Sequence, residues 1–226
     1  MRRPPDSVGR AILLRCAQAD RAIGGRFGDM IGTRYDRIVK AAEGVIARRG
    51  FHQASIREIA RTAGLSLAGL YHYVHGKDEL LFLVLDRALD RLLAALDAAV
   101  AGSPAPEARL RALVRTHLAF AFAEPAALKI INRDWELLGG ARRSEIAAKR
   151  AEYLRRGVAI LRDLDPHGRT PDELYSATNL LLGMLNGIAT RPFLRADADA
   201  RALAAEVAAL FLSGFLAAAP AEEVTP

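Results

Sequence analysis

Residues 55–81, SIREIARTAGLSLAGLYHYVHGKDELL, constrain the fold more than any other stretch of the chain. They contain two short helical patterns separated by a turn. Ser55 and Glu58 have the spacing of a capping box, which starts a helix. Gly64 suits the left-handed residue that ends this helix, and Ser66 can cap a second one. Two helices joined by a short turn with glycine form a helix-turn-helix, whose second helix enters the major groove of DNA.

This stretch and the helical pattern before it, IVKAAEGVIARRGF, resemble the DNA-binding region of TetR-type bacterial transcriptional repressors. The shared pattern is IA–AG–S–LY–K–EL within residues 34–81. The chain departs from it at Ser55, where the family usually has Thr, at Val74, where Phe is common, and at Gly76, where Ser or Thr would cap the next helix. The resemblance implies an all-α fold. An N-terminal three-helix helix-turn-helix domain would be followed by a C-terminal helical bundle for ligand binding and dimerisation.

The expected domain organisation has four segments. They are an N-terminal extension over residues 1–33, partly disordered or with one extra helix; the helix-turn-helix DNA-binding domain over 34–80; the ligand-binding and dimerisation domain over 81–219; and a tail over 220–226. In the extension, the pattern favours a helix over residues 8–23, before the glycines of residues 24–32. The role of the extension stays open. So does that of Cys16, the single cysteine, which excludes an intrachain disulfide.

The positive charge of the chain is concentrated in its N-terminal third. The net charge is +6, of which residues 1–33 carry +3 and residues 34–80 carry +3, whereas residues 81–226 are neutral overall. This placement favours double-stranded DNA as a partner, because phosphates supply the sequence-independent part of DNA affinity. No secretion signal is evident, and the most apolar run, residues 207–219, is too short to cross a bilayer. We therefore expect a cytoplasmic protein without membrane contact.

The residues expected to contact DNA lie on the helix-turn-helix and at the start of the next helix. They are Ser55, Arg57, Ser66, Leu67, Ala68, Gly69, Tyr71, His72, Tyr73 and Lys77. The start of a helix offers backbone N–H groups to a phosphate, and the small Ala68 and Gly69 let the backbone approach the base edges. The resemblance implies DNA contacts at Tyr71, His72, Tyr73 and Lys77. The alternative for Tyr71 is partial packing in the domain core.

Apolar residues at helical spacing predict the remaining elements. After a first helix at residues 34–49 and the helix-turn-helix, we expect helices over residues 77–100, 106–123, 125–138, 144–164, 170–190 and 197–218. They carry no nucleophile elbow, phosphate-binding loop or zinc-protease motif. His72 and His75 are three residues apart but have no further ligand near them in sequence. We expect no enzyme activity, no cofactor and no metal site.

Polar and aromatic residues on otherwise apolar helices are the candidates for a ligand pocket. They are His117, Phe120, Trp135, Tyr153, Asn179, Met184 and Asn186, each of which can also be an ordinary core residue. The C-terminal part is similar to regulators of fatty-acid, sterol or aromatic-acid catabolism, in the patterns His117-xx-Phe120, Asp134-Trp135-Glu136, Arg150-xx-Tyr153 and residues 182–187. Several of those regulators sense acyl-CoA esters. The resemblance therefore implies an effector such as an acyl-CoA or a hydrophobic acid.

Two late helices are expected to form the interface of a homodimer. The interface candidates are Leu181, Leu185, Ile188, Leu203, Val207, Leu210, Phe211 and Phe215, and Gly183 and Gly187 permit close helix approach. The function that follows is a dimeric repressor released from a palindromic operator by a small hydrophobic or acyl-CoA ligand. The alternative is a constitutive DNA-binding regulator without an inducer. The inducer, the operator and its target genes, and repression versus activation stay open.

Overall fold

The computed structural model describes residues 26–189 and 200–217, and every regular element within these ranges is a helix. The elements are α2 (Arg26–Arg49), α3 (Ile56–Thr62), α4 (Leu67–Tyr71), α5 (Lys77–Ala101), α6 (Pro106–Ala123), α7 (Pro125–Arg133), the short 3-10 helix η1 (Trp135–Leu137), α8 (Gly140–Leu164), α9 (Pro171–Ala189) and α11 (Ala200–Ala217). The all-α fold class is confirmed. The expected helix at residues 8–23, Cys16 and the tail lie outside the described residues.

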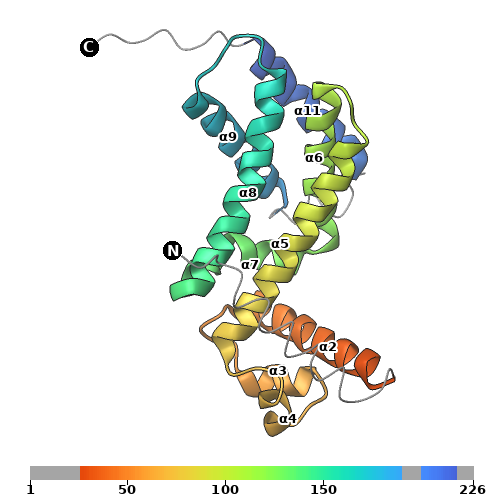
Figure 1. Cartoon of the computed structure of the whole chain (residues 1–226), viewed down its shortest axis with the longest axis vertical. Helices are drawn as coiled ribbons and strands as arrows, with labels where there is room; N and C mark the ends of the chain where they lie inside the picture. The colour runs from red at the N-terminus through yellow and green to blue at the C-terminus, as the bar shows by residue number, and fades with distance from the viewer. Residues whose placement is uncertain (1–25, 190–199, 218–226) are drawn as a thin grey trace, which may run out of the picture.

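The molecule is elongated, with two parts joined by one long helix (Figure 1). Helices α2, α3 and α4 gather at one end and are called the head below. Helix α5 starts in the head and runs on into the C-terminal part, where α6 and α8 pack against it. Helix α9 packs against α6 and α8, and α11 packs against α6. Helix α7 lies at the junction and packs against both α2 and α5. The expected domain boundary after residue 80 therefore falls inside a continuous helix.

The first helix is longer than the sequence pattern indicates. Its expected apolar face is confirmed, since Ile38, Ala42 and Val45 are fully buried. It begins at Arg26 rather than at residue 34, in spite of its early glycines. Glycine costs a helix about 1 kcal/mol relative to alanine but does not forbid it. Further along, an ion pair between Asp36 and Arg87 joins α2 to α5.

Three other helix boundaries differ from the expected ones. Helix α4 ends at Tyr71, so His72 and Tyr73 lie in the following turn, where Tyr73 N–H donates to the Leu70 carbonyl. Val74, three residues after the end of α4, is fully buried. Helix α7 ends at Arg133 and not at residue 138, because the backbone tightens into η1 after Asp134. Helix α8 begins four residues early, at Gly140, whose positive φ of 56° permits the turn.

The cap of α5 is confirmed as unusual. Its N-cap residue Gly76 supplies no side-chain hydrogen bond. Glu79 takes over this role, because its carboxylate accepts a hydrogen bond of 2.6 Å from the backbone N–H of His75. The Glu79 side chain is buried there. A buried charge-assisted cap fixes the start of α5, which is also the point where the C-terminal part meets the head.

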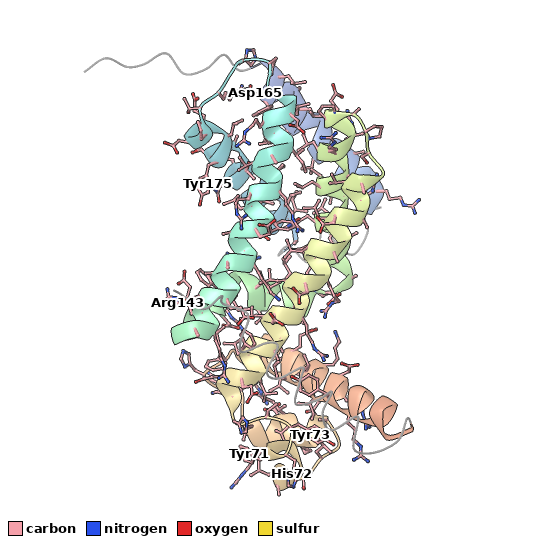
Figure 2. All side chains as sticks on the ribbon, viewed as in Figure 1. Tyr71, His72, Tyr73, Arg143, Asp165 and Tyr175 are labelled. Atoms are coloured by element: carbon pink, nitrogen blue, oxygen red, sulfur yellow. The ribbon has the colours of Figure 1, made fainter. Side chains whose placement is uncertain are left out.

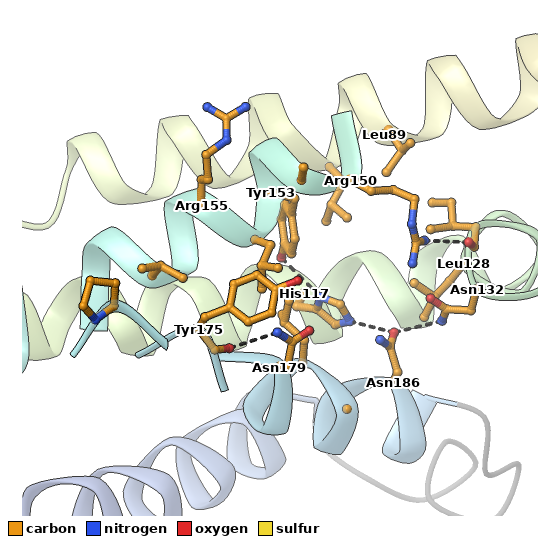
Figure 3. A pocket seen from close by; sticks show the side chains of 18 of the residues that line it. Leu89, His117, Leu128, Asn132, Arg150, Tyr153, Arg155, Tyr175, Asn179 and Asn186 are labelled. Atoms are coloured by element: carbon orange, nitrogen blue, oxygen red, sulfur yellow. Dashed lines mark hydrogen bonds between the residues drawn. The ribbon is translucent and has the colours of Figure 1, made fainter. Parts of the chain in front are cut away.

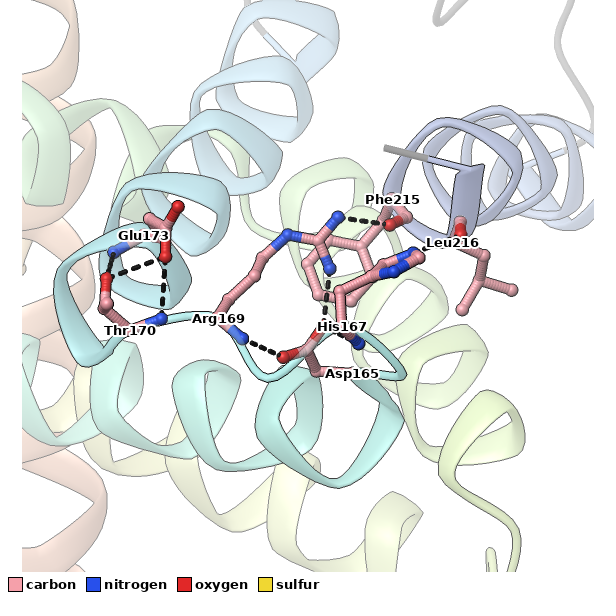
Figure 4. A network of polar contacts seen from close by, with 7 residues as sticks. All are labelled: Asp165, His167, Arg169, Thr170, Glu173, Phe215 and Leu216. Carbon is pink, nitrogen blue, oxygen red and sulfur yellow. Dashed lines mark hydrogen bonds and ion pairs between the residues drawn. The ribbon is translucent and has the colours of Figure 1, made fainter. Parts of the chain in front are cut away.

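The turn between α8 and α9 ties these helices to the end of α11 (Figure 4). Asp165 and Arg169 form a buried ion pair at 2.5 Å. Arg169 also donates to the Phe215 carbonyl, and His167 to the Leu216 carbonyl, both at 2.7 Å. Cationic or N–H donors at the last carbonyls of a helix are favourable because they oppose its dipole. A capping box between Thr170 and Glu173 starts α9 directly afterwards.

Candidate DNA interface and ligand cavity

The helix-turn-helix has the cap geometry that its sequence predicts. The Ser55 side chain accepts a hydrogen bond from Glu58 N–H at 3.3 Å, and the Ser66 side chain accepts one from Gly69 N–H at 3.0 Å. Gly64 has a φ of 72° between the two helices. Leu70 is fully buried and holds α4 on the core of the head. The two cap bonds fix where each helix begins, and the burial of Leu70 fixes the position of α4 in the head.

The ten residues expected to contact DNA lie together at the free end of the head. Ser55, Arg57, Ser66, Ala68, Tyr71 and His72 are exposed, and Leu67, Gly69, Tyr73 and Lys77 are partly buried. Figure 2 shows Tyr71, His72 and Tyr73 at the end of the molecule opposite to Asp165. The Tyr71 side chain is 47% exposed, so it does not fill the core. Tyr73 packs partly against the core, which leaves it less free to reach a phosphate.

Lys77 is engaged within the protein. Its ammonium donates to the carbonyl of His52 at 3.1 Å and lies 4.6 Å from the ring centre of Phe51. These contacts hold the turn between α2 and α3 against the start of α5. An ammonium group has three N–H donors, so a phosphate contact at Lys77 is compatible with this geometry. The structure gives Lys77 a structural role that the sequence pattern did not indicate.

A cavity of about 720 Å³ lies in the C-terminal part, between α5, α6, α7, α8 and α9 (Figure 3). Its apolar walls include Leu89 and Leu92 of α5, Leu128 and Ile131 of α7, and Leu182 of α9. The polar residues that line it are His117, Asn132, Arg150, Arg155, Asp172, Tyr175, Asn179 and Asn186, together with Tyr153. Apolar walls with a few convergent polar groups are typical of small-molecule sites.

Four polar side chains form a chain of hydrogen bonds along one wall. His117 Nδ1 lies 3.2 Å from the Tyr153 hydroxyl, and Nε2 lies 3.3 Å from Asn186 Oδ1. Asn132 donates to the same Asn186 oxygen at 2.9 Å. Burial lowers the pKa of His117 to about 4, whereas the hydrogen bond to Asn186 opposes this shift, so the ring is neutral near pH 7. A neutral ring accepts from Tyr153 at Nδ1 and donates to Asn186 from Nε2.

Arg150 brings a partly buried positive charge to the cavity wall. Its guanidinium donates to the Ile131 carbonyl at 2.7 Å and lies 4.8 Å from the ring centre of Trp135. Burial lowers its pKa, and the nearby Glu136 opposes this shift. Among the described residues Arg150 forms no ion pair within 4 Å. In contrast, the neighbouring Lys149 is paired with Asp86 and Asp90.

The structure brings some of the expected pocket residues together and leaves others out. His117, Tyr153, Asn179 and Asn186 line the cavity. Phe120 is buried in the core, Trp135 stacks under Arg150 outside the cavity lining, and Met184 is 37% exposed on the outer face of α9. Sequence reasoning missed the apolar walls and Tyr175. Its spacing of four residues from Asn179 on one helix was an available signal.

The expected dimer residues divide between the protomer's own core and its surface. Leu181, Leu185, Val207 and Phe215 are buried within the protomer, and Ile188, Leu203 and Phe211 pack against its core. Leu210 alone of the eight is largely exposed, at 66%. The apolar side chains that α9 presents outward are instead Leu180 and Met184. A partner packing on α9 would meet these residues rather than Leu181 and Leu185.

Helix α11 is mostly apolar, with Arg201 and Glu206 as its charged residues. From its sequence we expected an apolar run of residues 207–219, which is too short to cross a membrane. The helix itself has 18 residues, and by length and composition alone it could cross one. Only 28% of this helix is buried inside the protomer. A core or interface helix of a soluble protein has the same composition, so this is weak evidence of a membrane span. Leu210 is the large apolar side chain that α11 exposes among the described residues.

Two family profiles match the chain. Residues 38–84 match the profile of bacterial regulatory proteins of the tetR family, and residues 103–215 match that of the tetracyclin repressor-like C-terminal domain. An HTH-type transcriptional regulator of Mycobacterium tuberculosis is 30% identical over 173 residues, which cover 76% of this chain and 81% of that protein. The chain spans about half of the length of several other curated HTH-type regulators that it matches.

Solved structures show the same fold. A TetR-family transcriptional regulator from Bordetella parapertussis superposes with a TM-score of 0.75 at 27% identity, over 80% of this chain and 95% of that chain. AibR, solved in complex with isovaleryl coenzyme A and operator DNA, gives a TM-score of 0.69 at 24% identity, over 81% of this chain and 97% of that chain. The chain therefore belongs to the TetR family of bacterial transcriptional regulators, which bind DNA through a helix-turn-helix.

Proposed function

We propose that this chain is a cytoplasmic, homodimeric repressor that leaves a palindromic operator when a small hydrophobic or acyl-CoA ligand occupies the cavity. The observation that carries this proposal is the cavity of about 720 Å³, which shares helix α5 with the DNA-reading head. Its volume is within the range of about 300–1,000 Å³ that is usual for small-molecule sites. The domain division at residue 80, with the ligand domain over 81–219, belongs to the same proposal.

The polar groups of the cavity suggest the chemistry of the ligand. The guanidinium of Arg150 has no carboxylate within 4 Å among the described residues, so it is available to a carboxylate or phosphate of a ligand. The neutral chain of His117, Tyr153 and Asn186 suits an uncharged polar group such as a carbonyl. The similar fold of AibR, which was solved with isovaleryl coenzyme A, supports an acyl-CoA or a hydrophobic acid.

The outer surface of α9 and α11 supports the proposed dimer. Leu180, Met184 and Leu210 are exposed apolar side chains on these helices, and a Cβ added at Gly183 or Gly187 would meet nothing within 4 Å. An isologous contact between two copies would cover them. The dimer would place two recognition helices about 34–36 Å apart, or a multiple of this, to read a palindrome. Relatives include both a repressor and an activator by name.

A ligand titration tests this function. A duplex selected by the purified protein from a random pool serves as the operator, and its affinity is measured with added acyl-CoAs and free hydrophobic acids. Arg150→Gln should weaken binding of the anionic ligands about tenfold, since hydrogen bonds to charged groups contribute about 1.5–3 kcal/mol. Arg143→Gln is the matched control, because Arg143 also lies near Trp135 but does not line the cavity.

The same titration decides between the two candidate functions. Ligand binding that lowers operator affinity supports the inducible repressor. A selected duplex whose affinity no ligand changes, together with no ligand binding, supports the constitutive DNA-binding regulator instead. Raised operator affinity on ligand binding would indicate a ligand-dependent corepressor or activator. Because a ligand moves an equilibrium only by its differential affinity for two states, each outcome assigns a sign to the coupling.

A further inference from the structure

The last turn of α7 is bonded to three different helices through three consecutive residues. The carbonyl of Ile131 accepts from Arg150 of α8 at 2.7 Å. The side chain of Asn132 donates to Asn186 of α9 at 2.9 Å. Arg133 donates to the carbonyl of Ile46, in the last turn of α2, at 3.1 Å. The first two bonds lie in the wall of the cavity, whereas the third reaches the DNA-reading head.

Arg133 is held in a fixed orientation at this contact. Its Nε donates to Asp134 Oδ1 at 2.8 Å, and its terminal nitrogen donates to Asp134 Oδ2 at 2.6 Å. The Asp134 carboxylate is buried, with 4% of its side chain exposed. Such a two-pronged pair aligns the planar guanidinium. The same terminal nitrogen that bonds to Asp134 also bonds to the Ile46 carbonyl. A movement of the last turn of α7 therefore moves the hydrogen-bond donor of this carbonyl.

The carbonyl of Ile46 lies where the direction of the next helix is set. Its intrahelical partner is the N–H of Gly50 at 2.8 Å, and Gly50 has a φ of 81° at the end of α2. Five residues later the chain reaches Ser55, the cap of α3. Positive charge at the C-terminal end of a helix is favourable because it offsets the helix dipole. A displacement of Arg133 therefore acts on the residues that orient the helix-turn-helix.

We propose that Arg133 is a positioning residue that couples the state of the cavity to the DNA affinity of the head, through its bond to the Ile46 carbonyl. A ligand that bonds to Arg150 or Asn186 competes with the bonds of Ile131 and Asn132, and so shifts the last turn of α7. Arg133 carries this shift to the end of α2. The inference rests on the proposed ligand-responsive function, but it assigns the transmission to α7 in addition to α5, the helix that the cavity shares with the head.

A double-mutant cycle tests this coupling without knowledge of the ligand. Asn186→Ala removes the cavity bond to Asn132, and Arg133→Gln removes the charge at Ile46. Affinity for the selected duplex is measured for both single variants and the double variant by fluorescence anisotropy. The two side chains are not in contact, so independent effects should multiply. We expect Asn186→Ala to change the affinity about fivefold in the wild-type background, the lower end of allosteric coupling, and less than about twofold with Arg133→Gln present.

Two controls separate positioning from general destabilisation. Lys129→Gln removes an exposed cation from the same helix α7 and should leave the effect of Asn186→Ala unchanged. Arg133→Lys keeps a donor and a charge, and should restore part of the coupling. Hydrogen exchange of the Gly50 N–H, which shares the Ile46 carbonyl, should speed up in Arg133→Gln but not in Lys129→Gln. If Arg133→Gln does not fold, Asp134→Asn loosens the same guanidinium and takes its place in the cycle.

The outcomes are distinct. A smaller effect of Asn186→Ala in the Arg133→Gln background, with recovery in Arg133→Lys, supports the coupling. The same effect of Asn186→Ala in both backgrounds, including no effect in either, overturns it. Failure of the ligand titration while the cycle shows coupling would reject the inducible function but not the route through Arg133. A ligand that lowers operator affinity equally in wild type and Arg133→Gln would reject the route but not the function.

Discussion

The DNA-reading head and the ligand cavity are built from contacts of very different reach along the chain. In the head, Ser55 bonds to Glu58 and Ser66 to Gly69, three residues apart in each case. In the cavity, His117 bonds to Tyr153 and Asn186, which lie 36 and 69 residues away. A short motif therefore specifies the head almost by itself. The cavity exists only once five helices have packed, so its chemistry depends on burial that no local pattern encodes.

The largest effect that tests this difference is the response of the cavity to acid. Burial lowers the pKa of His117 from 6.5 to about 4 in the folded protein. Between these pH values the unfolded chain binds a proton and the folded chain does not, so stability falls as the pH drops from 6.5 to 4. The loss approaches roughly 3 kcal/mol at the lower limit. Denaturant unfolding at pH 7 and pH 4.5 should show it.

Two variants check that burial of the imidazole is the cause. His117→Gln cannot titrate, so its free energy of unfolding should fall less than that of the wild type over the same pH interval. Tyr153→Phe removes the hydroxyl partner but keeps His117 buried, and should retain the wild-type pH dependence. Equal acid sensitivity of wild type and His117→Gln would show that the imidazole is protonated without penalty, and the cavity wall would then be open to water.

The second effect contrasts a glycine in each region. A Cβ at Gly157 of α8 would lie 2.6 Å from Cγ2 of Thr178 on α9, and Thr178 is fully buried with its hydroxyl bonded to the Leu174 carbonyl. Gly157→Ala should therefore destabilise the protein by about 2 kcal/mol, within the usual cost of overpacking. At Gly44 of α2 the nearest atom is the end of the flexible Arg48 side chain at 3.3 Å. Thermal unfolding should show Gly44→Ala to be neutral or stabilising by up to about 1 kcal/mol.

These two glycines illustrate what the sequence could and could not predict. Helical spacing placed α5, α6 and α9 within a residue or so of their observed ends, and it identified the buried face of α2. It gave no sign that Gly157 is a point of close helix approach, because that depends on Thr178, 21 residues later on another helix. The three misplaced pocket residues have the same cause. Phe120, Trp135 and Met184 have suitable chemistry, but the packing of the helices places all three outside the cavity lining.

The dimer face shows a related limit. Helix α9 has apolar residues on several sides, so Leu181 and Leu185 form one stripe and Leu180 and Met184 another. Periodicity detects both stripes but cannot rank them, since either could face the protomer's own core. In the structure the first stripe is buried and the second is exposed. In contrast, the polar face of α2 left a single choice, and the pattern identified it.

A third effect tests the head directly. Tyr71→Ala should lower operator affinity about tenfold, within the range expected for one lost DNA contact. Because Tyr71 is 47% exposed and α4 is anchored by Leu70, the melting temperature should change little. The matched control is Tyr175→Ala, an exposed tyrosine in the C-terminal part, which should leave the affinity of the ligand-free protein unchanged. Equal affinities for Tyr71→Ala and wild type would remove Tyr71 from the DNA interface.

The smallest effect distinguishes two roles of Lys77, the residue where head and C-terminal part meet. If its ammonium contacts a phosphate, Lys77→Ala should weaken binding to all duplexes alike and reduce the slope of log affinity against log salt by about one. If the ammonium stays on the His52 carbonyl and the Phe51 ring, the slope should not change. The backbone amides of residues 51–54 should then exchange hydrogen faster, because the variant removes the side chain that holds the turn between α2 and α3.

Arg61→Ala removes an exposed cation on α3 and serves as the control. It gives the change of slope expected from a surface charge that lies outside the predicted contacts. A slope change for Lys77→Ala larger than this calibration assigns the residue to DNA. A slope change no larger than that of Arg61→Ala, with faster hydrogen exchange of residues 51–54, assigns Lys77 a structural role where the head meets the C-terminal part.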